Sequence, residues 1–128
     1  MTKDMTGARS QIRQVITDLG TEVFFIPITV SINSYGDKTE TEGVGVSVQA
    51  IPAEYFKGRY NYQPVGNINE GDVILIIRDD ETLDIRDGST IYTIELDDSI
   101  YQVDSIEDFD IANITLAKQV ILKKRLYG

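Results

Sequence analysis

Apolar and polar residues alternate along most of this chain after Gly20, and that two-residue period constrains the fold more than any other feature. Successive side chains of a strand point to opposite faces, so alternation predicts strands with one buried face. Pro27 cannot donate a ladder hydrogen bond, so we expect an edge or a bulge there. The segment 23–33 is predicted to be a long strand whose apolar face consists of Phe24, Ile26, Ile28, Val30 and Ile32.

Further strands follow the same logic. Residues 34–37, SYGD, have turn chemistry, and residues 43–51 alternate again. Residues 72–79 form a nearly continuous apolar run, which indicates a strand covered on both faces. Further strands are predicted at 82–88, 90–96, 99–103 and 113–125. The spacing predicts a mainly β fold: a small β-barrel or sandwich of about six to eight strands.

The N-terminal segment has a different period. Ile12, Val15, Ile16 and Leu19 follow the helical i, i+3, i+4, i+7 spacing, and Gly20 stands where a helix ends. With 128 residues, the chain is expected to be a single domain. We divide 1–128 into an N-terminal helix (1–20), strands (21–51), a long loop (52–71) and the remaining barrel strands (72–128).

Composition excludes several kinds of chemistry. The chain has no cysteine and no histidine, which excludes thiolate metal sites and Ser-His or Cys-His nucleophile pairs. The formal net charge of −9 disfavours a general nucleic-acid binder, because such binding relies on basic groups that displace counterions. No apolar run is long enough for a membrane span, and residues 1–10 do not resemble a secretory signal, so we expect synthesis inside a cell and no membrane partner.

Two acidic stretches were candidates for a metal or acid/base site. In residues 78–88 the acids do not follow the calcium-loop spacing, so we interpret them, Asp79 and Asp80 included, as solvated turn carboxylates. In 97–110, we expect Asp97 and Asp98 to form a turn, a short strand to end at Asp104, and the following acids to lie in turns and loops. We therefore predict no metal, no cofactor, no catalytic residue and no enzymatic activity.

Aromatic and basic residues interleave in the long loop 52–71. They are Tyr55, Phe56, Lys57, Arg59, Tyr60 and Tyr62. This pattern suits base stacking along a single strand of nucleic acid, but it also suits packing on the barrel or a subunit interface. The acidic net charge favours the second interpretation.

The C-terminal residues 123–128 are locally basic although the domain is acidic. Lys123, Lys124 and Arg125 could contact Glu107, Asp108 and Asp110 of another copy. Such a head-to-tail contact is heterologous, and heterologous contacts can close into rings.

The order of elements resembles the head-closure, or stopper, proteins in the neck of long-tailed bacteriophages. A short helix precedes a long strand, which is followed by a Tyr-Gly-Asp turn and a strand ending in Ala50. A long loop comes next, and then an Asp-Gly turn at 87–88 near Tyr92. The chain continues with Tyr101-Gln102-Val103 and ends with a basic strand. The resemblance covers most of the chain through short motifs. It implies a small β-barrel that forms a ring below the portal, extends the DNA channel, helps to retain the genome and docks the tail.

The resemblance also implies partners and a location. The partners are other copies in the ring, a portal or adaptor protein above, a tail-terminator or tail-completion protein below, and double-stranded DNA that passes without sequence-specific binding. The location is the virion neck, after synthesis in the host cytoplasm. One long loop of such proteins can project as a gate; residues 52–71 match it best, and 34–43 second. A tail-completion or baseplate component and a single-stranded nucleic-acid-binding barrel remain alternatives.

Overall fold

The computed structural model describes residues 6–56, 62, 64, 68–81, 83, 90–96, 98–111 and 114–125. The predicted strand at 82–88 lies almost entirely outside these residues. Along the chain, the elements are α1 (Thr6–Leu19), β1 (Thr21–Ile32), β2 (Lys38–Glu42), β3 (Val46–Pro52), the 3-10 helix η1 (Ala53–Phe56), β4 (Val73–Arg78), β5 (Thr90–Leu96), β6 (Ser99–Ile111) and β7 (Ile114–Lys124).

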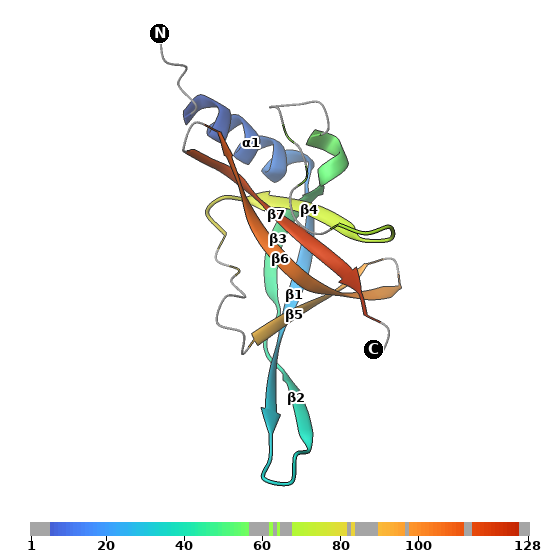
Figure 1. Cartoon of the computed structure of the whole chain (residues 1–128). Coiled ribbons are helices and arrows are strands. Elements are labelled where there is room, and N and C mark those ends of the chain that lie inside the picture. The colour runs from blue at the N-terminus through green and yellow to red at the C-terminus, as the bar shows by residue number, and fades with distance from the viewer. Residues whose placement is uncertain are drawn as a thin grey trace.

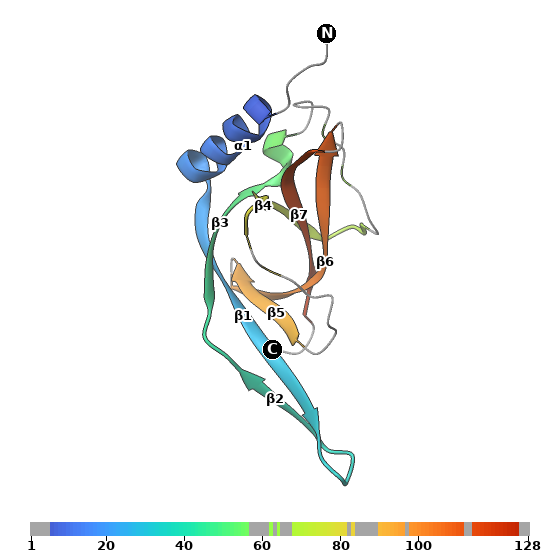
Figure 2. The ribbon, with the colours of Figure 1, turned by 90° about the vertical axis from the view of Figure 1, so that its left-hand side faces the viewer.

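The strands form a closed barrel. Within the described residues, seven strands are ordered β2-β1-β3-β4-β7-β6-β5, and β1 also pairs with β5. This last pairing closes six strands into a barrel and leaves β2 outside it, as Figures 1 and 2 show. Each pair in the sheet is antiparallel. The mainly β barrel with one N-terminal helix confirms the predicted fold class.

Two apolar clusters hold this architecture together, and β4 belongs to both. Leu75 and Ile77 point into the barrel, where they join Phe25 and Val103. Ile76 lies in the other cluster, between the outer face of the sheet and the two helices. Burial on both faces explains why β4 is apolar at nearly every position, as its sequence predicted.

Helix α1 packs on the outside of the barrel through one stripe. Ile12 and Ile16 are completely buried, and Val15 packs beside them. The Gly20 amide donates to the Ile16 carbonyl at 2.9 Å, and a Cβ atom at Gly20 would lie 2.3 Å from that oxygen, so the close approach requires glycine here. Leu19, the last residue of α1, departs from the prediction, because it is 59% exposed.

The apolar face of β1 is not the one that simple alternation predicted. Phe25 is completely buried, whereas Phe24 is 55% exposed, and Ile28 is buried again. The buried face therefore changes phase between Phe25 and Ile28, around Pro27. One edge of β1 also changes its partner there. Up to Phe25 this edge pairs with β3, and from Ile28 onward it pairs with β2. The expected irregularity at Pro27 is present. Because of it, the buried face of β1 before Pro27 is the opposite of the one that the sequence pattern assigned.

Strand β6 is much longer than predicted. It runs to Ile111, so Glu107, Asp108 and Asp110 lie on a strand and not in turns. Val103 pairs with Leu122 and Ser105 with Ile121, which makes Asp104 the extra residue of a β-bulge. A second irregularity follows at Phe109 and Asp110. The bulge at Asp104 shifts the alternation of β6 by one residue, which hid the strand from a two-residue period.

We expect Phe25→Ala to lower the free energy of unfolding by about 3–5 kcal/mol, because it leaves a cavity inside the barrel. The neighbouring Phe24→Ala is the matched control and should cost less than about 1 kcal/mol, because that side chain faces outward. Urea denaturation of both variants measures the difference. A larger loss for Phe24→Ala would contradict the phase change in β1.

Candidate assembly surface

A two-stranded arm projects from one end of the barrel. We define the arm as residues 28–42, comprising the distal half of β1, the connecting turn and β2. Ile28 pairs with Glu42 and Ile32 with Lys38, so the two strands are in register along the whole arm. β5 accompanies β1 only as far as Thr29. Beyond that point the arm extends away from the described part of the barrel, as both ribbon views show (Figures 1 and 2).

The tip of the arm is an ordered turn, as residues 34–37 predicted. The Asn33 Oδ1 atom accepts hydrogen bonds from the amides of Tyr35 and Asp37, both at 2.9 Å. The Asn33 amide donates to the Asp37 carbonyl at 2.9 Å, and Gly36 adopts a φ of 83°, which suits glycine. This network fixes the backbone and leaves Tyr35 89% exposed at the far end of the molecule.

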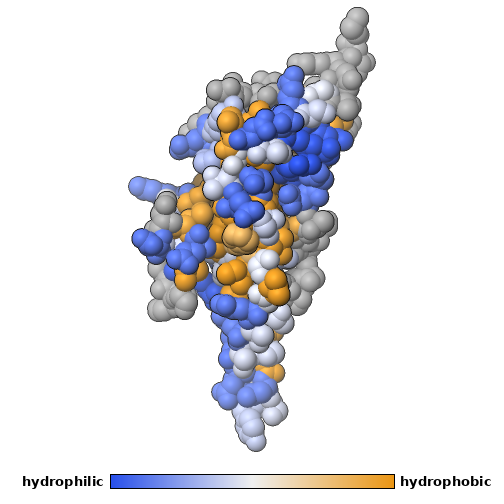
Figure 3. Space-filling model, turned by 180° about the vertical axis from the view of Figure 1, so that it is seen from behind, coloured by the Kyte–Doolittle hydropathy of each residue, from blue (hydrophilic) through white to orange (hydrophobic). Residues whose placement is uncertain are grey.

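Apolar side chains are exposed along the arm and at its root. Ile32 is 68% exposed on the arm, and Val44, at its root, is 89% exposed. Viewed from the side opposite to Figure 1, apolar side chains gather over the middle of the molecule and recur along the arm (Figure 3). A two-stranded ribbon alone in water is at best marginally stable, which makes the arm the candidate assembly surface of the described residues.

Contacts at the root fix the direction of the arm. The Arg125 Nη2 atom lies 2.9 and 3.1 Å from the two carboxylate oxygens of Glu40. The Arg125 amide donates to the Ile100 carbonyl at 2.7 Å, and the Gly43 amide donates to the Pro27 carbonyl at 2.8 Å. The arm is therefore held to the barrel at one end and extends freely at the other.

The charges predicted for a subunit interface have mixed environments. Arg125 contacts Glu40 of the same chain, and Lys123 lies 2.7 Å from Asp72 of the same chain. These two cations are therefore engaged within the subunit. The remaining four side chains, Lys124, Glu107, Asp108 and Asp110, are exposed.

The aromatic residues of the predicted loop are mostly part of the core. Phe56 and Tyr62 are buried and Tyr55 is half-buried, so these rings pack on the barrel, which is one of the two arrangements that the sequence favoured over base stacking. Tyr62 packs edge to face with Phe56 and Phe109, its hydroxyl donates to Gln119 Oε1, and burial raises the pKa of Tyr62 to about 12. These rings belong to the interior, because residues 53–56 form η1 against the sheet. Lys57, Arg59 and Tyr60 lie outside the described residues.

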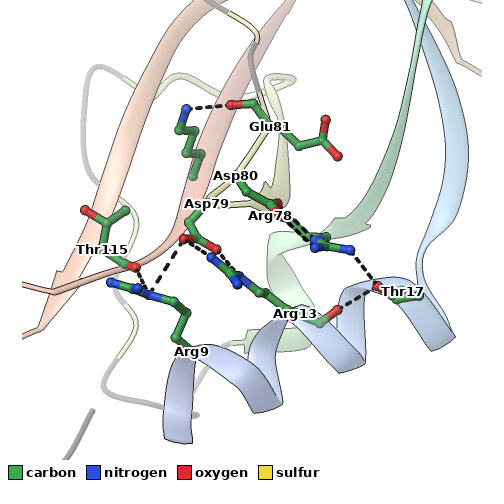
Figure 4. A network of polar contacts seen from close by, with 9 residues as sticks. Arg9, Arg13, Thr17, Arg78, Asp79, Asp80, Glu81 and Thr115 are labelled. Carbon is green, nitrogen blue, oxygen red and sulfur yellow. Dashed lines mark hydrogen bonds and ion pairs between the residues drawn. The ribbon is translucent and has the colours of Figure 1, made fainter. Parts of the chain in front are cut away.

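An ionic clamp, which the sequence did not reveal, joins α1 to the end of β4 (Figure 4). Arg13 makes two hydrogen bonds to Asp79, at 2.6 and 2.7 Å. Arg9 donates to the Thr115 carbonyl at 3.0 Å and lies 3.7 Å from Asp79. The prediction that Asp79 is a solvated turn carboxylate is therefore wrong, because the folded chain places a helix arginine beside it. The hydrogen bond from Arg13 lowers the pKa of Asp79.

Within the described residues, no three acidic side chains are arranged to hold a metal ion. In the same part of the chain, no helix is long and apolar enough to cross a membrane. Comparison with protein-family models, curated proteins and solved structures finds no match to this chain.

The Asp79 clamp predicts a specific pH dependence. The folded pKa lies below the ordinary value, so the clamp stabilises the fold fully above the unfolded pKa of about 3.9 and loses this effect as pH falls through the folded pKa. Between about pH 5 and pH 3, the free energy of unfolding should fall more for the wild type than for Asp79→Asn. Asp80→Asn, at the exposed partner of Arg78, is the control. Equal slopes for the wild type and Asp79→Asn would contradict the clamp.

Asn33→Ala should loosen the arm tip, because it removes the acceptor of two amide hydrogen bonds. We expect a lower heteronuclear NOE for the amides of Tyr35 and Asp37 and an unchanged melting temperature of the barrel. Ser34→Ala, at the adjacent exposed position, should leave the NOE unchanged. An unaltered NOE in Asn33→Ala would show that other contacts order the tip.

Proposed function

We propose that this protein is a structural subunit that assembles into a ring, and that the ring forms part of the neck of a long-tailed bacteriophage. In this position, it would extend the DNA channel below the portal, help to retain the packaged genome and dock the tail. The observation that carries the proposal is the arm, an ordered element with exposed apolar groups that reaches beyond the chain's own barrel. The neck assignment itself rests on the family resemblance of the sequence.

The arm suits a ring for a physical reason. A projecting element on one side and a barrel surface on the other can meet head to tail, and such a contact between copies is heterologous. When the rotation between successive copies closes, such contacts form a ring in which each subunit extends one arm and receives one. Assembly would bury Ile32, which the isolated subunit leaves exposed.

The electrostatics are compatible with a DNA conduit. The net charge is −9, and Glu107, Asp108 and Asp110 are exposed along β6. A conduit that repels phosphate lets DNA pass without gripping it. The same features also suit a tail-completion or baseplate component, which remains the alternative place of assembly. Single-stranded nucleic-acid binding is less favoured, because Phe56 and Tyr62 are buried.

The proposal predicts that the arm is required for assembly. Thr29 and Thr41 are paired in the arm, so an Asn-Gly turn can replace residues 30–40 and leave a shortened hairpin. In sedimentation velocity, the wild type should form a discrete oligomer as its concentration rises, visible as a ring in negative stain, whereas the shortened variant should remain monomeric with an intact barrel.

Arg125→Ala is the matched control for this deletion. The shortened variant also loses the ion pair between Glu40 and Arg125, whereas Arg125→Ala removes the pair and keeps the arm. We expect Arg125→Ala to assemble. A wild type that stays monomeric at high concentration would overturn the proposed function, and so would a shortened variant that still forms rings. A gel shift with single-stranded DNA at low salt would support the nucleic-acid alternative instead.

A further inference from the structure

A pocket of about 300 Å³ lies where β3 ends, beside η1 and the start of β4. Its apolar walls come from Pro52, Tyr62, Pro64, Val73 and Ile74. Proline and aromatic faces are flat and rigid, and pockets of this kind receive the buried aromatic anchors of protein interfaces. The pocket therefore suits a planar apolar side chain that carries one polar group.

The arm tip offers such a side chain. Tyr35 is 89% exposed, whereas the other described tyrosines, Tyr55, Tyr62, Tyr92 and Tyr101, are half-buried or buried. A tyrosine ring supplies a large apolar face at low cost in conformational entropy, and its hydroxyl can donate a hydrogen bond. The Asn33 network holds the tip in one conformation, which lowers the entropic cost of docking further.

The arm carries one cation, Lys38, beside three acids, Asp37, Glu40 and Glu42, so charge supports docking at a single position. The pocket also contains Glu54 and Asp72, and Glu54 is exposed at the rim. Lys123 lies 2.7 Å from Asp72, and its hydrogen bond lowers the pKa of that carboxyl, so Asp72 stays ionised and compensated within its own chain. At the arm, the exposed Lys38 begins β2 directly after the tip. Docking would bring this cation towards Glu54.

The tip and the pocket lie at opposite ends of the subunit. In Figures 1 and 2 the arm extends from the lower end of the barrel, whereas η1 lies at the upper end beside α1. Tyr35 therefore cannot reach the pocket of its own chain. Any contact between them joins two copies, and a head-to-tail contact gives the heterologous geometry that a ring requires.

We propose that Tyr35 of each copy inserts into the pocket formed by Pro52, Tyr62, Pro64, Val73 and Ile74 of the next copy, with Lys38 beside Glu54. This inference rests on the proposed ring and identifies the receptor for the arm. It places the hydroxyl of Tyr35 near the acidic rim and the ring against the two prolines. The arms then run around the ring and connect each barrel to its neighbour.

Site-directed crosslinking tests this contact directly, because the chain contains no cysteine. Ser34→Cys, which keeps the neighbouring Tyr35, and Glu54→Cys are purified separately, mixed at a concentration where the wild type is oligomeric, and treated with a short bismaleimide. We expect a covalent dimer that contains one chain of each variant. A single chain carrying both substitutions should give a ladder of covalent multimers. Ser31→Cys, exposed on the arm but away from the tip, is the control partner for Glu54→Cys and should crosslink poorly.

A second measurement distinguishes the pocket inference from the ring proposal. In sedimentation equilibrium, Tyr35→Ala should weaken association by at least about tenfold, and Tyr35→Phe by less, because Phe keeps the ring and loses only the hydroxyl. Wild-type oligomers with no Ser34–Glu54 crosslink above the Ser31 control would overturn the pocket inference and leave the ring proposal intact. A wild type that is monomeric throughout would overturn the proposed function itself.

Discussion

The pairing of β1 with β5 is the constraint on which the rest of the structure depends. It joins the two ends of the sheet, so six strands enclose one apolar interior and the barrel has no open edge. β1 can close the barrel because it changes both its partners and its buried face around Pro27. Its first half pairs with β3, and its second half continues past β5 into the arm. Barrel closure and arm projection are thus consequences of the same strand.

The arm links this architecture to the proposed function. Its root is held by Arg125 and Gly43, and its tip is ordered by Asn33. An element that is ordered at both ends and exposed along residues 31–42 is preorganised for a partner, and preorganisation reduces the entropic cost of binding. The pocket beside η1 offers a complementary surface at the opposite end of the subunit. The projection of the arm, its ordered tip and the proposed fit of that tip to the pocket are the reasons for proposing self-assembly.

Features set by local sequence were predictable, and those set by distant residues were not. The α1 stripe at Ile12 and Ile16, the doubly buried β4 and the turn at 34–37 follow from local periodicity or turn chemistry, and the structure contains them. The bulge at Asp104 broke the period and concealed most of β6. Arg13 and Asp79 are 66 positions apart, so no spacing could reveal their contact. The segment 34–43, which the resemblance matched second to a projecting loop, forms the tip and return strand of the arm. It projects because β1 continues beyond the end of its pairing with β5.

Hydrogen–deuterium exchange at two protein concentrations tests most directly whether the arm meets a second copy. In dilute monomer, amides of β2 (38–42) should exchange rapidly, because the outer edge of this strand has no partner within the described chain. In concentrated protein, the arm and the pocket segments 52–54 and 72–74 should become protected together, while central β7 stays equally slow in both. If an oligomer forms and the arm exchanges at its dilute rate, the arm is not the assembly element.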